Sequence, residues 1–272
     1  MQRPPLNKAA TRLGSLVLLL ASQAVFAPHY ARTNQSPDTL TPVQRAIQTQ
    51  RERLSSSSDE ERRDAVMRLE AMHVAEASRV ALTGLTDSSV MVRAVAAKAV
   101  LSLPVAESVP ALLPLLNDKD EFVRREVAYA LGLTSSKAAT AALLERLLSD
   151  KEDGVRAAAA VALGRIADET SVVTLATVLT GQAKRKGKQE KNEFVLRAVA
   201  AALGRIGTSA GVPALIATLM NEKLPSDVRR EAAAALGSIG DRSAIDALSR
   251  AATSSDPYLS HIAFESLKKI PR

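Results

Sequence analysis

The chain has 272 residues, of which 46% are hydrophobic and 24% are charged, a composition typical of a folded globular protein. It contains no cysteine, which excludes disulfides, thiolate metal sites and a catalytic thiol. Only 3% of the residues are aromatic and none is tryptophan, so the core has to be built from aliphatic side chains. The formal net charge is +7, which makes the placement of the basic residues relevant to any choice of partner.

Residues 1–27 have the three-part pattern of a secretory signal peptide. Arg3, Lys8 and Arg12 precede an apolar run over residues 16–27, which is short for a membrane span of about 20 residues. Small residues place the cleavage site after Ala24 or after Ala27. We therefore expect an exported protein, periplasmic or extracellular, or a membrane-tethered one if the signal is not cleaved. A buried helix of the domain is the remaining alternative for this segment.

The next two segments lead into the main part of the chain. Residues 28–41, PHYARTNQSPDTLT, are polar with two prolines, which favours a flexible lead-in. Residues 42–54 carry Val43, Ile47 and Leu54 at helical spacing, which predicts a first helix. The polar remainder of that helix would suit the outer face of a degenerate N-terminal repeat.

An alanine-rich phrase returns along the rest of the chain. FVRREVAYALG ends at Gly132, GVRAAAAVALG at Gly164, FVLRAVAAALG at Gly204 and DVRREAAAALG at Gly237, and three weaker copies keep the same frame. We call the second residue of the V-R pair position zero. It falls at Arg62, Arg93, Arg124, Arg156, Leu196, Arg229 and Ser260. A period of this length indicates a repeat array over residues 42–272.

Each copy is preceded by a second apolar block, such as SVPALLPLLND or GVPALIATLMN, and by a short polar turn. In three copies an aspartate (Asp87, Asp118 or Asp150) lies in that turn, six residues before position zero. We expect this aspartate to cap the second helix and the closing glycine to take the left-handed conformation that ends it. Each unit is therefore predicted to be a helix, a turn and a second helix.

The alanines have a packing role in this scheme. At about 100° per residue, positions −1, +3, +6, +7 and +10 fall on one helix face. In the fourth copy these positions hold Val155, Ala159, Ala162, Leu163 and Ile166. The small side chains let neighbouring helices approach closely and the large ones fill the core, so helix pairs are predicted to stack on one another.

The combination of acidic turn, V-R pair and A-x-x-A-L-G resembles HEAT repeats, specifically the bacterial short type named for phycobilisome lyases. The resemblance covers about residues 42–272, some seven repeats with the first and last degenerate. It implies an all-α fold, an α-solenoid that winds as a right-handed superhelix of helix pairs. The family includes scaffolds, phycobilin lyases and deoxyhypusine hydroxylase, so the resemblance indicates almost nothing about activity.

The resemblance also implies a structural ladder between repeats, because the arginine at position zero and the turn aspartate often pair in HEAT-like arrays. Leu196 and Ser260 replace that arginine in the fifth and last copies, so we expect the ladder to be interrupted there. The residues that fit the ladder are Asp87, Arg93, Asp118, Arg124, Asp150 and Arg156.

No motif for catalysis emerges from the chain. The resemblance to deoxyhypusine hydroxylase implies paired His-Glu motifs that hold two irons, but the corresponding places read Arg125-Glu126 and Arg230-Glu231. A glycine-rich phosphate loop is absent from the sequence, and its G-x-S-x-G match at residues 207–211 follows an alanine-rich helical block where the catalytic motif requires a strand. The histidines are widely separated: His29, His73 and His261. We expect a protein that is not an enzyme, with no catalytic residue, metal or cofactor. A lyase-like or oxidoreductase relative is the alternative.

The remaining candidate is a binding surface on the second helices, which line the concave face in HEAT arrays. Position +1 points away from the buried stripe and is mostly basic, and position +5 lies nearby. This pattern predicts a groove for a protein or peptide, an acidic one in particular, because arginine and tyrosine are enriched at binding hot spots. Ordinary solvated surface is the alternative. The candidate residues are Arg63, Lys98, Arg125, Tyr129, Arg197, Arg230 and His261.

The fifth copy contains a basic insertion at residues 181–192, where five cations oppose only Glu190. Such a run is usually a mobile, solvated loop, and its alternative role is weak contact with an anionic membrane surface. No aromatic residue separates the basic ones, so base stacking has no support and nucleic acid is not expected. The basic residues are Lys184, Arg185, Lys186, Lys188 and Lys191.

Overall fold

Helices arranged in successive pairs make up the computed structural model, which describes residues 40–181, 184–185, 188–189 and 192–271. The first helix of each pair is α1 (Pro42–Arg53), α3 (Ala75–Ala81), α5 (Val105–Leu112), α7 (Thr140–Ser149), α9 (Val172–Leu179), α11 (Val212–Met220) or α13 (Ile245–Ala251). The second is α2 (Asp59–Ala71), α4 (Val90–Ala99), α6 (Glu121–Leu133), α8 (Asp153–Ile166), α10 (Glu193–Ile206), α12 (Ser226–Ile239) or α14 (Pro257–Lys269). The predicted signal peptide and nearly all of the lead-in lie outside the described residues.

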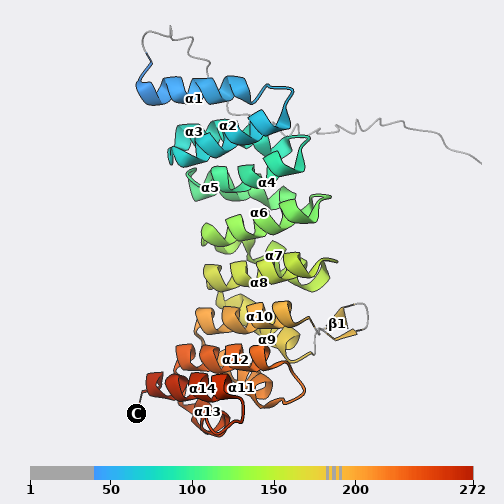
Figure 1. Cartoon of the computed structure of the whole chain (residues 1–272), viewed down its shortest axis with the longest axis vertical. Helices are drawn as coiled ribbons and strands as arrows, with labels where there is room; N and C mark the ends of the chain where they lie inside the picture. The colour runs from blue at the N-terminus through green and yellow to red at the C-terminus, as the bar shows by residue number, and fades with distance from the viewer. Residues whose placement is uncertain (1–39, 182–183, 186–187, 190–191, 272) are drawn as a thin grey trace, which may run out of the picture. The chain divides into compact units, whose positions relative to one another are not determined.

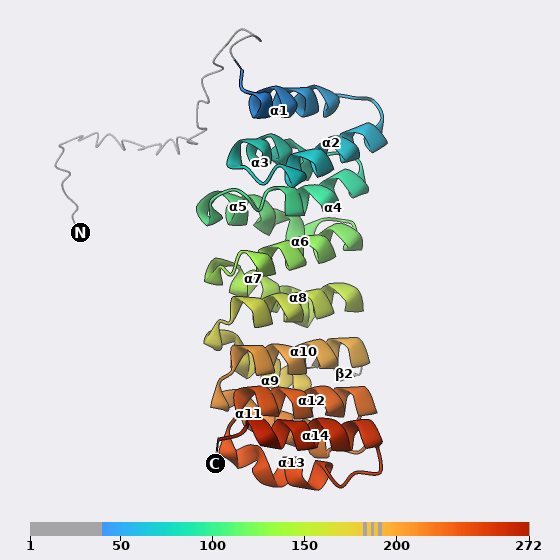
Figure 2. The same ribbon diagram turned by 60° about the vertical axis from the view of Figure 1, so that its left-hand side comes forward.

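The seven pairs stack one on the next within the unit Leu40–Arg272, with the second helices forming one continuous row (Figure 1, Figure 2). The all-α solenoid predicted from the repeat period is confirmed. Short 3-10 segments complete the first helices: η2 (Leu82–Thr86) and η3 (Leu113–Asn117) follow α3 and α5. Four more precede the later first helices: η4 (Lys137–Ala139), η5 (Glu169–Ser171), η6 (Ser209–Gly211) and η7 (Arg242–Ala244).

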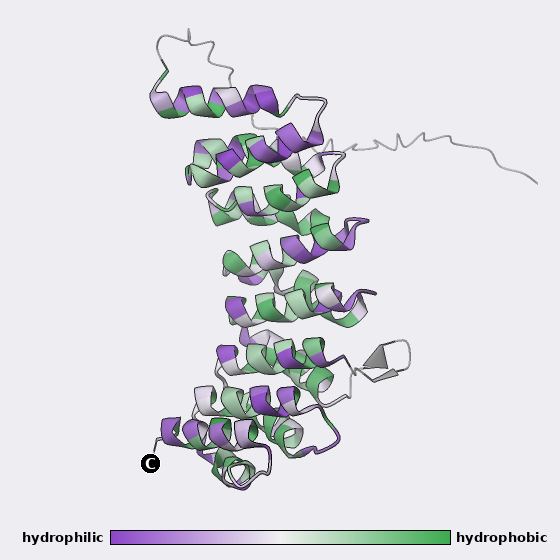
Figure 3. Cartoon of the chain, viewed as in Figure 1, coloured by the Kyte–Doolittle hydropathy of each residue, from purple (hydrophilic) through white to green (hydrophobic). Residues whose placement is uncertain are grey.

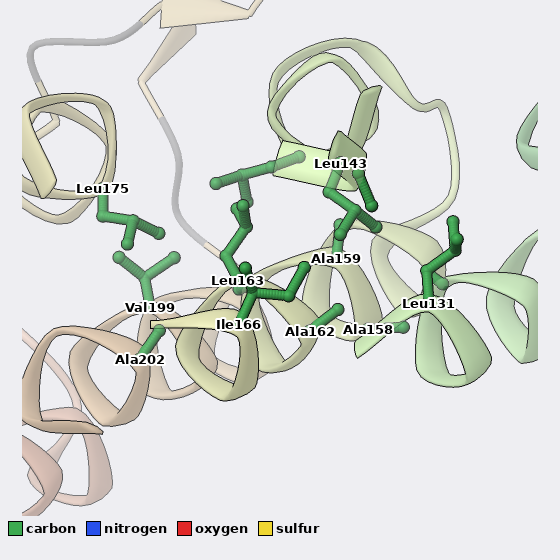
Figure 4. Packing of buried hydrophobic residues seen from close by; sticks show 14 of the residues in the cluster. Leu131, Leu143, Ala158, Ala159, Ala162, Leu163, Ile166, Leu175, Val199 and Ala202 are labelled. Atoms are coloured by element: carbon green, nitrogen blue, oxygen red, sulfur yellow. The ribbon is translucent and has the colours of Figure 1, made fainter. Parts of the chain in front are cut away.

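The core is aliphatic, as the composition requires. In α8 the five residues of the predicted stripe, from Val155 to Ile166, are all at most 5% exposed. Figure 4 shows Leu163 and Ala159 facing Leu143 of the preceding first helix, while Ala202 and Val199 of α10 lie on the other side. The apolar stripe of each second helix therefore packs both on its own partner helix and on its neighbours.

The closing glycines do not end the second helices, which corrects the sequence-based expectation. Gly132, Gly164, Gly204 and Gly237 all lie inside helices, each facing the next second helix. A Cβ added at Gly164 would lie 2.7 Å from the Cα of Ala202. The glycines are there because two helix backbones approach too closely for any side chain, not because a left-handed conformation is needed.

The left-handed residues that end the second helices stand three positions later in the repeat, eleven residues after position zero. Two of them are glycines, Gly207 and Gly240. The others carry a Cβ, which is destabilising in the left-handed conformation. The non-glycine members are His73, Ser135 and Ala167.

The turn aspartates are not the N-caps that the sequence predicted. The N-caps are the residues two places later, such as Ser89 and Asp120. The aspartate instead accepts a hydrogen bond from the N–H of that N-cap residue, at 2.8 Å from Ser89 to Asp87 and 2.9 Å from Asp120 to Asp118. This bond fixes the turn, and both oxygens of the same carboxylate also accept hydrogen bonds from the arginine of the preceding repeat.

The basic insertion contains a short antiparallel hairpin in place of a simple loop. Strands β1 (Lys184–Arg185) and β2 (Lys188–Gln189) pair Lys184 with Gln189 and Arg185 with Lys188. Among the described residues, no helix is long and apolar enough to span a bilayer. Hydrophilic and hydrophobic residues both occur along the second helices (Figure 3).

Candidate protein-binding face

Arg93 and Arg124 are buried, Arg62 has 12% of its side chain exposed, and all three join successive repeats. Each guanidinium donates two hydrogen bonds to the turn aspartate of the following repeat, as Arg93 does to Asp118 at 2.7 and 3.0 Å. Arg62 pairs in the same way with Asp87, and Arg124 with Asp150. A third nitrogen donates to carbonyls of the arginine's own turn. These side chains hold the array together and are not available to a partner.

The ladder changes after the fourth repeat. Arg156 is buried and bonds to Asp153 in the first turn of its own helix. Leu196 stands at position zero in α10 and is 1% exposed, so an apolar contact replaces the ion pair. Arg229 donates to the carbonyl of Leu219 at 2.9 Å, and Ser260 to that of Ala252 at 2.6 Å. The repeats from α9 to α14 therefore depend on apolar packing more than the earlier ones do.

The basic row at position +1 is largely neutralised by nearby carboxylates. Arg63 lies 3.3 Å from Glu60, and Arg125 lies 3.3 Å from Glu126. Arg230 pairs with both Asp227 and Asp256, at 2.7 and 2.9 Å. Three of the predicted cations thus have partners within the protein, which weakens the sequence-based picture of a free arginine row.

The surroundings of Arg125 add further negative charge. A polar hollow of about 330 Å³ at the N-terminal ends of α6 and α8 is lined by Arg125 together with Glu121, Glu152 and Asp153. The pKa of Glu121 is raised because its carboxyl shares a hydrogen bond with that of Glu152. The guanidinium also lies over the ring of Phe122, 4.9 Å from its centroid. Arg125 is therefore held in place on both sides.

Arg197 differs from the other members of the row. It is half-buried, forms no ion pair with a described carboxylate, and its buried Nε has no hydrogen-bond partner among the described residues. Its charge acts on Glu231 of α12, whose pKa is raised by burial and only partly lowered by that charge.

The remaining predicted residues are scattered over the same face. Lys98 pairs with Glu70 at 2.7 Å. Tyr129 is half-buried against the core, and His261 is exposed on α14. The structure places these seven residues on one row of helices but does not join them into one cluster.

A second hollow, of about 440 Å³, lies over α8, α10 and α12. Its floor is made of residues with little or no side chain, and Glu231, Arg205 and Ser238 are its polar members. The floor residues are Val161, Gly164, Ala198, Ala201, Ala202, Gly204, Ala234 and Ala235. The alanines that pack the helices thus also leave an open depression on the exposed side.

Two exposed arginines beside this hollow were missed from the sequence. Arg165 on α8 and Arg205 on α10 both stand nine residues after position zero, so they occupy the same place in successive repeats. Neither has an ion pair with a carboxylate within the described part of the chain. The signal was the repeated ALGRI phrase, in which the arginine follows the closing glycine directly.

The structure describes only part of the basic insertion. Lys184, Arg185 and Lys188 lie in the hairpin strands, while Lys186 and Lys191 lie outside the described residues. Over the described ranges, no group of three or more His, Asp or Glu side chains is placed to hold a metal ion.

Helix pairs in a single stack, joined by a ladder and by close helix contacts, define an α-solenoid repeat protein. The family of HEAT repeats matches residues 78–164, 109–190 and 187–268. The chain belongs to this family. No curated protein sequence matches it.

Solved structures show the same architecture. The complex of CpcE and CpcF of phycocyanin lyase from Nostoc sp. PCC7120 is 24% identical, with 86% of this chain and 88% of that one covered and a TM-score of 0.50. An engineered protein is 22% identical over 82% of this chain and 68% of its own, with a TM-score of 0.52. Human deoxyhypusine hydroxylase in complex with glycerol is 18% identical over 83% and 96%, with a TM-score of 0.42. At these identities the likeness concerns the fold alone.

Proposed function

We propose that this array is a non-catalytic, exported scaffold that binds an acidic segment of another protein on its row of second helices. The observation that carries the proposal is the hollow of about 440 Å³ over α8, α10 and α12, with Arg165 and Arg205 exposed beside it. Alanine and glycine in its lining leave room for a polypeptide, and cations that pair with no described carboxylate favour acidic groups of a partner.

The choice of this region follows from the charges of the whole face. A cation that already has a carboxylate partner, such as Arg63 or Arg230, must give up that partner before it binds another. Within the described residues Arg165 and Arg205 have no carboxylate partner to give up, and Arg197 has a buried nitrogen without a hydrogen-bond partner. Long-range attraction from such groups increases the association rate and selects acidic partners.

The proposal is tested by affinity capture from an envelope extract, with residues 40–272 as bait. In one variant Arg165 and Arg205 are both changed to glutamate. The matched control is Arg51→Glu with Arg250→Glu, which reverses two arginines in the last turns of first helices. Because all four arginines lie in a last helical turn, the loss of helix-dipole stabilisation is the same in both variants.

We expect a partner that is retained by the wild-type and control baits and lost from the Arg165/Arg205 variant. Its measured affinity should fall by roughly tenfold or more in that variant, and should also fall as salt is raised. Equal capture by all three baits would contradict the proposal. Circular dichroism must show the same helical content for each bait.

A further inference from the structure

The aromatic side chains of the array have an uneven distribution. All of those in the described residues lie on second helices, and none is in the core. They are Phe122, Tyr129, Phe194, Tyr258 and Phe264. Close contacts such as that between Gly132 and Ala162 leave no room for a ring between the helices. Packing explains why the rings are outside, but it does not explain why they are all on one row of helices.

Three apolar residues of α6 form a stripe on that row, which we call the α6 stripe: Phe122, Tyr129 and Leu133. Their spacings of seven and four residues place them on one helix face. Leu133 is 50% exposed, while Phe122 and Tyr129 are half-buried and packed against the core. Arg125 lies over the Phe122 ring and restrains it further. Rigid, partly buried apolar groups of this kind lose little entropy when another side chain is laid on them.

The α6 stripe lies beside the two unpaired arginines. Leu133, Arg165 and Arg205 all stand nine residues after position zero, on the consecutive second helices α6, α8 and α10. Repeat equivalence therefore places them in one line across the array, with the apolar residue first and the two cations after it. Ser238 on α12 continues the line and lines the hollow.

The spacing of this line sets the spacing of a ligand. Packed helix axes lie about 8–10 Å apart, so the midpoint between Arg165 and Arg205 is roughly 12–15 Å from α6. An extended peptide rises about 3.3 Å per residue and covers that span in about four residues. The hollow lies over α8, α10 and α12, so it adjoins the cation end of this path.

We infer that the partner segment is extended, with a large apolar side chain on the α6 stripe and, about four residues away, a carboxylate between Arg165 and Arg205. The inference rests on the proposed function and names the motif that the face recognises. A segment of this kind meets the apolar stripe and the unpaired cations at the same time, whereas a purely acidic or purely apolar segment uses one of them.

Fluorescein-labelled synthetic peptides test the inference on the folded array. Each carries one phenylalanine and a pair of glutamates in a glycine-serine background, with the glutamates adjacent to the phenylalanine, about four residues away or about eight residues away. Both chain directions are made. Fluorescence anisotropy measures binding to wild-type protein, to Leu133→Ser and to Leu148→Ser. Leu148 is the control because it is 41% exposed on α7, a first helix.

The intermediate spacing should bind best, and Leu133→Ser should weaken it roughly tenfold while Leu148→Ser does not. Binding that is independent of spacing, or unchanged by Leu133→Ser, overturns the inference. If such binding is still lost with Arg165→Glu and Arg205→Glu, the proposed function stands without it. If no peptide binds at all, the motif is wrong, and the capture experiment alone then decides the proposed function.

Discussion

The close contact between α8 and α10 predicts opposite effects for two glycine-to-alanine changes in the same helix. Gly164 faces Ala202, and an added Cβ would lie 2.7 Å from its Cα and 3.0 Å from its Cβ. Gly154 lies exposed near the start of the helix, where the nearest atom to an added Cβ is Cδ of Arg125 at 3.8 Å. The change at position 164 therefore forces a backbone apart, while the change at position 154 meets ordinary contact.

The magnitudes follow from these distances. Overpacking of this kind costs about 1–3 kcal/mol, and the gain in helix propensity of up to about 1 kcal/mol offsets only part of it. Gly164→Ala should thus lower the free energy of unfolding, whereas Gly154→Ala should leave it unchanged or raise it slightly. For an array of this size, each kcal/mol corresponds to a shift of about 2–4 °C in Tm.

Urea unfolding followed by circular dichroism measures both changes, with hydrogen exchange added because stacked repeats need not unfold in one step. Exchange should accelerate in α8 and α10 of the Gly164→Ala variant. If Gly164→Ala is as stable as the wild type, the helices separate at little cost, and the reading of the repeated glycine as a close-contact residue is wrong.

Three further changes test the other structural devices. Ala167→Gly should stabilise the array by about 1 kcal/mol in thermal unfolding because φ is 54° there, and Gly207→Ala should do the reverse. Leu163→Ala should cost about 2–5 kcal/mol in the same assay. Burial alone would raise the pKa of Asp118, but hydrogen bonds from Arg93 and the Asp120 N–H outweigh it and lower the pKa. This carboxylate therefore stabilises the fold above its unfolded pKa and stops doing so as pH falls through the folded value. Asp118→Asn should cost about 3 kcal/mol at neutral pH. The variant should lose less stability than the wild type as the pH falls below about 4, and an equal loss in acid would contradict this.

The fold could be predicted because the sequence itself repeats with a regular period. The period fixed the number of helix pairs, and the 3.6-residue spacing around Val155 and Leu163 identified the buried face. Both signals depend only on local order along the chain, which a single sequence contains in full.

The role of the closing glycine could not be predicted in the same way. Gly164 follows a leucine near the end of an apolar block, as a helix-ending glycine also does. What distinguishes the two roles is the backbone at Ala202, 38 residues away in the chain, whose Cα would lie 2.7 Å from a Cβ added at Gly164. The residue that does end α10, Gly207, stands in the less regular part of the repeat.

The internal partners of the candidate arginines could not be predicted for a related reason. Sequence position placed Arg63, Arg125 and Arg230 on the outer side of their helices, but it did not show that carboxylates one residue, one turn or one repeat away pair with them. Arg165 and Arg205 were overlooked because each follows the closing glycine and looked like part of a helix end. The number of charged residues on one face therefore does not show how many of them lack an ion-pair partner.

The two devices that join the repeats explain why the hollow lies where it does. From α2 to α8 successive repeats are tied by buried ion pairs such as that of Arg93 with Asp118, which act at the turns. Beyond α8 the described residues at position zero no longer pair with a turn aspartate, whereas the close contacts of the repeated glycines with the next second helix continue from Gly132 to Gly237. Helices that pack this closely need small residues on their shared flanks, and small flanks leave an open floor between them. Because the floor follows from packing, substitutions that fill it, such as Ala201→Leu, should block a ligand before they unfold the array.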